Sequence, residues 1–181
     1  MKSKRFEKDL YRWYGGNKET LIQRLFRPQE IRYMYHFRKS QDTNGFFFKS
    51  LHRFLLYRIS SKTQIQIPWS TRIGDGFYIG HCGRIIINSK AVLGKNINIA
   101  TGVTIGQENR GERQGCPKIG DNVWIGTNSV IVGNINIGDD VLIAPLTFVN
   151  FSVPSHSIVI GNPAKIIYKE KATEHYIDYT V

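Results

Sequence analysis

The sequence predicts a mainly β protein, a parallel β-helix preceded by a short α-helical segment. Three observations carry this prediction. An apolar residue recurs every six positions over most of residues 67–149, a small or apolar residue recurs four positions after it, and residues 1–65 show helical spacing instead. A helix needs apolar spacings of three and four and a plain strand needs two. A period of six is typical of a β-helix in which each repeat is one short strand and a turn.

The N-terminal segment, residues 1–65, is expected to be helical. Residues 18–26 and 28–41 carry apolar side chains three and four positions apart, and Pro28 can open the second of these helices at its first turn. Asn44 and Gly45 interrupt the pattern. Residues 46–60 then place a set of apolar side chains on one broad side: Phe47, Leu51, Phe54, Leu55 and Tyr57. Basic residues flank this side, which favours either packing on a neighbouring domain or contact with a membrane surface.

The charge of the chain is concentrated in the same segment. Residues 1–65 hold 15 Lys and Arg against 5 Asp and Glu, whereas the remaining residues hold 10 against 9. Such asymmetry indicates an anionic partner or a solvated basic face. Nucleic acid is not expected as the partner, because no groove-reading motif is present. The sequence contains no long apolar run and no recognisable signal peptide, so we expect a cytoplasmic protein. Its two cysteines, Cys82 and Cys116, do not have the spacing of a metal site, so we expect that no metal is required.

The six-residue repeat occupies thirteen positions, which are expected to point into the axis of the coil and to stack on one another. These positions are Ile67, Ile73, Ile79, Ile87, Leu93, Ile99, Ile105, Ile119, Ile125, Ile131, Ile137, Ile143 and Val149. Glycine often follows the repeat residue, at positions 74, 80, 94, 106, 120, 126 and 138. We expect these glycines to adopt a positive φ that other residues resist.

The repeat is interrupted twice. Eight residues separate Ile79 from Ile87, and fourteen separate Ile105 from Ile119. Because a stacked coil has no interior room, each insertion must bulge outward, and polar bulges on a rigid scaffold are common places for functional sites. The first insertion exposes His81, which is either a surface imidazole or a general base suited to neutral pH.

Four sequence blocks identify the family that the chain resembles. IGDGFYIGHCGRIIIN, VTIGQENRGERQGCPKIGDNVWIG, VIVGNINIGDDVLI and VIGNPAKII resemble the serine acetyltransferase-like branch of the hexapeptide acyltransferases. The similarity is greatest to the short relatives of capsular and exopolysaccharide biosynthesis, which share GHCG or a near variant. The resemblance implies a left-handed parallel β-helix over residues 66–167, a protruding loop at 107–118, a C-terminal tail at 168–181, a homotrimer and acetyl-CoA as donor.

The resemblance also assigns roles to individual residues. His81 falls on the catalytic histidine, which would take a proton from an acceptor hydroxyl. The coenzyme would lie in a cleft between subunits, beneath the loop 107–118, and would contact Gly106, Thr127, Ala144, Pro145 and Lys165. Gly106 and Gly126 are also suited to turns alone.

Several positions depart from the serine-specific pattern. Gly80 replaces an aspartate before the catalytic histidine, Gln66 replaces an acidic residue upstream, and Cys116 replaces a second histidine. Residues 1–65 stand where serine-specific enzymes have a long helical domain. Asp75 is the nearest carboxylate in sequence, so it and Cys116 are the candidate substrate-binding residues, although Asp75 also suits a turn.

These departures make a sugar of a surface polysaccharide, or its precursor, the expected acceptor. The assembly of lipid-linked glycans at an anionic membrane face would agree with the basic N-terminal segment. The alternative acceptor is L-serine. Two further alternatives are Cys82 as an acyl-accepting nucleophile, which its orientation relative to His81 disfavours, and a non-catalytic β-helix that binds a surface, which the scattered threonines disfavour.

Overall fold

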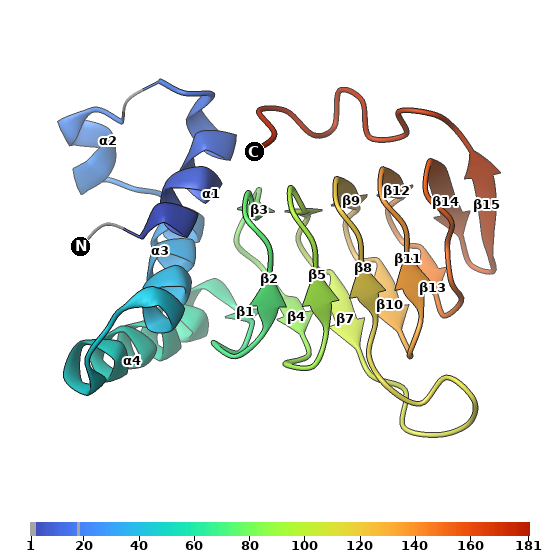
Figure 1. Cartoon of the computed structure of the whole chain (residues 1–181), viewed down its shortest axis with the longest axis horizontal. Coiled ribbons are helices and arrows are strands. Elements are labelled where there is room, and N and C mark those ends of the chain that lie inside the picture. The colour runs from blue at the N-terminus through green and yellow to red at the C-terminus, as the bar shows by residue number, and fades with distance from the viewer. Residues whose placement is uncertain (1–2, 18) are drawn as a thin grey trace.

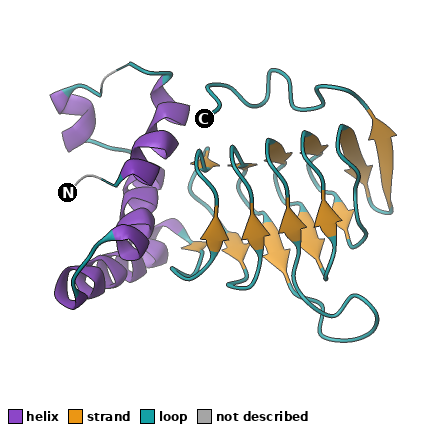
Figure 2. Ribbon diagram, viewed as in Figure 1, coloured by secondary structure: helices purple, strands orange, loops and turns teal. Residues whose placement is uncertain are grey.

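The computed structural model describes residues 3–17 and 19–181, and it consists of a bundle of helices followed by a three-sided coil of short strands (Figure 1, Figure 2). The helices are α1 (Lys4–Tyr14), α2 (Leu21–Leu25), α3 (Gln29–Asp42) and α4 (Phe46–Thr63). Ser3 caps α1 by accepting a hydrogen bond from the backbone of Phe6, and Gly15 ends it in the left-handed conformation. Pro28 occupies the N-cap of α3. The periodicity did not single out α1.

Helix α4 packs on α3 with one face only. Leu56, Ile59 and Thr63 are the buried residues of this helix, whereas Phe47 and Phe54 are 72% and 57% exposed. The broad apolar side predicted from the sequence therefore exists, but within the chain it largely faces outward rather than packing on a neighbouring domain. No helix within residues 3–17 and 19–181 has the length and apolar character needed to cross a bilayer.

The strands of residues 65–168 form three sheets, which are the three faces of the coil. Sheet A contains β1 (Ile65–Gln66), β4 (Ile85–Ile87), β7 (Thr104–Gly106), β10 (Val130–Val132) and β13 (Phe148–Val149). Sheet B contains β2 (Arg72–Ile73), β5 (Val92–Leu93), β8 (Lys118–Ile119) and β11 (Asn136–Ile137). Sheet C contains β3 (Tyr78–Ile79), β6 (Asn98–Ile99), β9 (Val123–Ile125), β12 (Val141–Ile143), β14 (Ser157–Gly161) and β15 (Ala164–Tyr168). Strands pair in parallel from coil to coil, and only β15 is antiparallel, to β14.

The interior of the coil confirms the six-residue prediction. All thirteen repeat positions are buried, none more than 4% exposed, and the second series four residues on is buried with them. Paired strands place these positions in register, as in the ladder of Ile87, Ile105, Ile131 and Val149 on sheet A. Each coil therefore buries its apolar side chains only by stacking on its neighbours.

The positive φ that was predicted for the repeat glycines is not found in the structure. None of Gly74, Gly94, Gly120, Gly126 and Gly138 has a positive φ. They are required by close approach between coils: a Cβ on Gly74 would lie 2.5 Å from the carbonyl oxygen of Gly94, and one on Gly138 would lie 2.4 Å from the backbone nitrogen of Ser155. The left-handed turn positions fall three residues after the repeat residue and are largely Asn, Asp or Gly, which tolerate that conformation.

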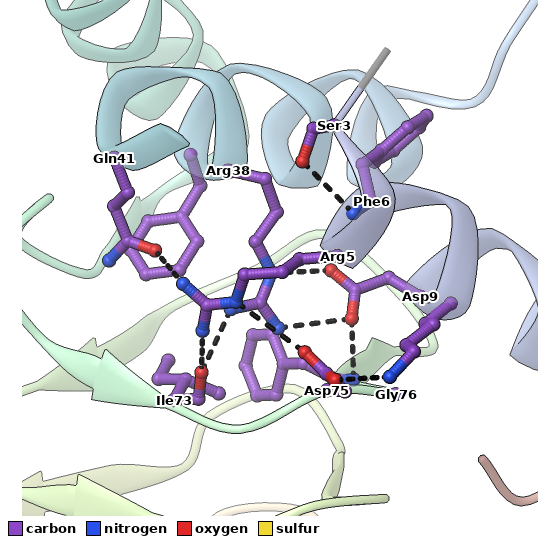
Figure 3. Close-up of polar contacts among 12 residues, drawn as sticks. Ser3, Arg5, Phe6, Asp9, Arg38, Gln41, Ile73, Asp75 and Gly76 are labelled. Carbon is purple, nitrogen blue, oxygen red and sulfur yellow. Dashed lines mark hydrogen bonds and ion pairs between the residues drawn. The ribbon is translucent and has the colours of Figure 1, made fainter. Parts of the chain in front are cut away.

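The helices are joined to the first coil by a buried ion pair. Arg38 of α3 donates to both carboxylate oxygens of Asp9 of α1, at 2.6 and 3.0 Å, and also to the carbonyl of Ile73 at 2.9 Å (Figure 3). Both side chains are fully buried. Asp9 in turn accepts from the backbone of Phe77 at 2.9 Å. Burial raises the pKa of Asp9, and Arg38 and the Phe77 N–H act against that rise.

The C-terminal tail runs back along sheet C to the helices (Figure 1). Asp140 holds its start by accepting hydrogen bonds from the backbones of Ala172 and Thr173. Further along, Asn98 donates to the carbonyl of Tyr176, and Arg12 of α1 donates to the carbonyl of Asp178. The tail therefore covers the outer face of sheet C and leaves the outer faces of sheets A and B uncovered within this chain.

Candidate active site

His81 lies where the chain turns from sheet C to sheet A, a position that we call the C–A corner. In each coil this corner follows a sheet C strand, and the corners are stacked by backbone hydrogen bonds from Gly80 to Ile99, Ala100 to Ile125, Gly126 to Ile143 and Ala144 to Val159. In the first coil the corner is lengthened by the insertion between β3 and β4, residues 80–84, which we call the His81 loop. The insertion bulges outward as predicted, and the His81 side chain is exposed.

Hydrogen bonds from three separate parts of the chain hold the His81 loop. The backbone N–H of Cys82 donates to Glu30 of α3 at 2.8 Å, and that of Gly83 donates to the carbonyl of Thr63 at the end of α4 at 2.9 Å. The hydroxyl of Thr101, on the next coil, donates to the carbonyl of Cys82 at 3.3 Å. The imidazole of His81 makes no hydrogen bond within the described chain, so both ring nitrogens are available to a ligand.

Four of the predicted coenzyme-binding residues share this corner. Thr127 follows β9 and Pro145 follows β12, and both occupy the position of His81 on later coils, whereas Ala144 occupies the position of Gly80. Lys165 lies on β15, where it pairs with Ile160 at the end of the same row. With adjacent coils about 4.8 Å apart, His81 and Pro145 are separated by three coils, or about 14 Å. The structure therefore places an exposed imidazole at one end of the row and an exposed lysine at the other.

Three predicted residues lie on other corners. Gly106 and Cys116 lie at the two ends of the loop 107–118, which projects from the corner between sheets A and B (Figure 1). Asp75 lies between sheets B and C, where its carboxylate accepts from Lys8 at 2.6 Å and lies near Arg5. Within one chain, neither Asp75 nor Cys116 meets His81. Asp75 is placed to fasten α1 to the first coil, and its role in binding substrate stays a prediction.

The two glycines whose roles were left open differ in their surroundings. A Cβ on Gly126 would lie 2.6 Å from the backbone nitrogen of Pro145, so glycine is required there for the coils to stack. A Cβ on Gly106 would meet only side-chain atoms of Val132 and Thr104, at 3.3 and 4.0 Å. A Cβ on Gly80, next to His81, would meet only Tyr78 at 3.5 Å. Packing therefore does not exclude a side chain at position 80.

Sequence reasoning missed Glu30. Its carboxylate comes from the first turn of α3, about fifty residues before His81, and no local pattern links the two positions. Burial, together with a hydrogen bond and the charge of Glu30, raises the pKa of the Cys82 thiol to about 12. Cys82 is therefore protonated at neutral pH, which further disfavours it as a nucleophile. Burial also raises the pKa of Cys116, although Lys90 opposes this effect.

These features define a class of protein: a parallel β-helix of hexapeptide repeats that carries an exposed histidine on a lengthened corner. Comparison with known proteins agrees. Residues 116–150 match the model of the bacterial transferase hexapeptide (six repeats). Serine acetyltransferase 2 of Arabidopsis thaliana is 40% identical over 110 residues, which are 61% of this chain and 34% of that protein. The chain thus spans about a third of the length of this relative.

Solved structures resemble more of the chain. The crystal structure of Neisseria gonorrhoeae serine acetyltransferase in complex with serine is 33% identical, with a TM-score of 0.70, and the match covers 91% of this chain and 68% of that one. The structure of Brucella abortus serine acetyltransferase in complex with coenzyme A is 27% identical, with a TM-score of 0.75, covering 91% and 66%. Because each match covers 91% of this chain, it includes most of the N-terminal helical segment. This segment therefore shares the fold of the two relatives. The chain belongs to the hexapeptide-repeat acyltransferases, in their serine acetyltransferase-like branch.

Proposed function

We propose that the chain is an acetyl-CoA-dependent O-acetyltransferase in which His81 is the general base. The observation that carries this proposal is the row on the C–A corner, with an unpaired imidazole at one end and Lys165 at the other. His81 would accept the proton of an acceptor hydroxyl while the hydroxyl oxygen forms a bond to the thioester carbonyl carbon. The carbon–sulfur bond then breaks, and the thiolate takes up a proton as free coenzyme.

The residues on the corner suit an extended coenzyme. Ala100, Gly126 and Ala144 are small, so a ligand can lie close to the backbone along several coils. At the far end, the exposed ammonium of Lys165 is suited to the nucleotide phosphates of the coenzyme. The relative solved with coenzyme A shares this fold.

L-Serine is the acceptor that the comparisons favour. The similar proteins reported above are named serine acetyltransferases, and one was solved with serine bound. This supports the alternative acceptor over the polysaccharide sugar that the sequence led us to expect. The absence of carboxylates at Gly80 and Gln66 still favours a sugar, but Glu30 brings a carboxylate to the His81 loop from α3. We therefore infer an amino-acid acceptor, with a sugar as the second candidate.

Acetyl transfer to the two acceptor classes separates these candidates. The purified chain should release thiol from acetyl-CoA faster with L-serine than with nucleotide-linked or lipid-linked sugars, because only serine offers an ammonium group to Glu30. Faster release with a sugar would overturn the choice of acceptor but not the transferase. The transferase proposal itself would fail if neither acceptor raised thiol release above the rate with acetyl-CoA alone.

A homotrimer would complete the site. The outer row of sheet A contains Ile86, Thr104, Val130 and Phe148 in register, whereas that of sheet B contains Arg72, Val92, Lys118 and Asn136. Sheet A is therefore the more apolar uncovered face and the better candidate for burial against other copies. If three chains turn sheet A toward a threefold axis, the C–A corner of each lies beside the A–B corner of its neighbour. The neighbour's loop 107–118, with Gly106 and Cys116, would then reach His81.

The outward face of α4 is suited to an anionic lipid surface. This helix exposes Phe47, Phe54 and Tyr57, and it carries four Lys or Arg residues and no acidic residue. Aromatic rings at a bilayer interface and cations near anionic headgroups both favour peripheral binding, each cation by about 1 kcal/mol. The same cations would repel each other if two copies met through this face, which disfavours a second copy as the occupant.

Vesicle sedimentation tests the lipid contact. The chain should sediment with vesicles that contain phosphatidylglycerol, remain in solution with phosphatidylcholine alone, and be released by high salt. Replacing Phe47 and Phe54 by serine should abolish sedimentation without lowering the melting temperature, because both rings are exposed. The proposal is wrong if the unaltered chain ignores anionic vesicles, or if the double variant changes only the oligomeric state.

A further inference from the structure

Among the described residues, Glu30 is the one charged side chain that hydrogen-bonds the His81 loop. Its Oε1 accepts from the backbone of Cys82, the residue next to His81, at 2.8 Å. The other hydrogen bonds to this loop are made by neutral groups: the carbonyls of Thr63 and Ile99 and the hydroxyl of Thr101. The helical segment therefore does more than cap the β-helix, since it brings a carboxylate to the residue beside the catalytic candidate.

Within the described residues, Glu30 takes part in no ion pair. The guanidinium of Arg12 donates to Gly76, Asn98 and Asp178. Glu30 is the acidic residue in the first turn of α3. Burial is the main cause that raises the pKa of the Cys82 thiol and of the Tyr78 hydroxyl, and the charge of Glu30 adds to the rise in both. These two residues flank His81 in the sequence.

A carboxylate can accept several hydrogen bonds, and the contact with Cys82 uses only part of this capacity. Gly80 has no side chain to fill the space on the other side of His81. The loop thus combines an exposed imidazole, an unfilled position and a carboxylate that forms no ion pair among the described residues. A group that bears an ammonium beside a hydroxyl fits this combination better than a neutral polyol does, because its cation would pair with the charge.

We propose that Glu30 is the acceptor-selecting residue of this enzyme: it fixes the His81 loop through the Cys82 N–H and offers its negative charge to the ammonium of an amino-acid acceptor. This inference rests on the proposed acetyltransferase function. It assigns to α3 a part of the acceptor pocket that neither Asp75 nor a residue at position 80 supplies.

Two substitutions separate the two roles of Glu30. Glu30→Gln keeps an oxygen that can accept from Cys82 but removes the charge, whereas Glu30→Ala removes both. For Glu30→Gln we expect the KM for L-serine to rise about 10- to 100-fold, the loss of one charge-assisted hydrogen bond, with kcat largely retained. The KM for 3-hydroxypropionate, which has the hydroxyl but no ammonium, should not rise. Glu30→Ala should lower kcat with both acceptors, because the loop loses its anchor.

Glu170→Gln is the matched control, since Glu170 is exposed and lies near the end of β15, away from the His81 loop. It should leave both KM values unchanged, and melting curves of all variants would confirm that each is folded. An unchanged KM for L-serine in Glu30→Gln, or an equal rise for both acceptors, would overturn the selecting role. Failure of the proposed function would be distinct, because it would be seen in the unaltered chain as no transfer to L-serine.

Discussion

Replacing Arg38 by methionine is expected to destabilise the fold by about 3–5 kcal/mol, the cost of removing one partner of a buried ion pair. The change leaves the carboxylate of Asp9 fully buried without its cation, and it leaves the carbonyl of Ile73 without its Arg38 donor. Chemical denaturation followed by circular dichroism would measure the loss. Because this pair joins α1, α3 and the first coil, the same variant should also weaken the support of the His81 loop.

Two further variants make this prediction specific. Adding Asp9→Leu to Arg38→Met should recover part of the loss, since an apolar pair of similar volume leaves no uncompensated charge. Replacing Lys8, which is half-exposed in its ion pair with Asp75, should cost no more than about 1 kcal/mol. If Arg38→Met cost as little as the Lys8 variant, the buried pair would not be what holds the helices on the β-helix.

Replacing His81 by alanine is expected to lower kcat for acetyl transfer by about 10²–10⁴-fold, the usual worth of a general base. The side chain is exposed and makes no hydrogen bond within the described chain, so neither the fold nor the binding of coenzyme should change. Steady-state thiol release would give the first result, and calorimetric titration with coenzyme A would give the second. His175→Ala, a change at an exposed histidine in the tail, is the matched control and should leave kcat unaltered.

This combination of results matters because a structural role for His81 would lower stability and coenzyme affinity together. A variant that binds coenzyme normally but does not transfer acetyl places the loss in the chemical step. If His81→Ala retained kcat within a few fold, another group would have to accept the hydroxyl proton, and Cys82 is poorly suited because its pKa is raised to about 12.

The β-helix could be predicted from the sequence because each coil repeats the same packing problem. An isoleucine recurs every six residues, as at Ile119, Ile125 and Ile131, and stacking the repeats as coils buries all of these side chains. The two insertions were visible for the same reason, because a rigid repeat cannot absorb extra residues inside. The geometric role of Gly74 was not visible, since the approach of Gly94 from the next coil depends on how the coils stack.

The candidate site could be predicted only in part. Thr127 and Pro145 fall at the same point of the repeat as His81, so the period itself aligns them on one corner. Contacts between the helices and the coil follow no period. For this reason, neither the ion pair of Asp75 with Lys8 nor the hydrogen bond from Cys82 to Glu30 could be predicted from the spacing. The sugar was expected on the same ground, because carboxylates were sought near His81 in sequence, whereas the comparisons favour the alternative, L-serine.

A single-turnover experiment tests most directly whether acetyl passes straight from the coenzyme to an acceptor under the control of His81. The chain is loaded with acetyl-CoA that is radiolabelled in the acetyl group, L-serine is added, and the label is followed with time in the chain and in the His81→Ala variant. We expect the label to move from coenzyme to O-acetylserine without appearing on the protein, and to stay on the coenzyme in the variant. Label on the protein before the acceptor is added, or equal transfer by the variant, would contradict direct transfer controlled by His81.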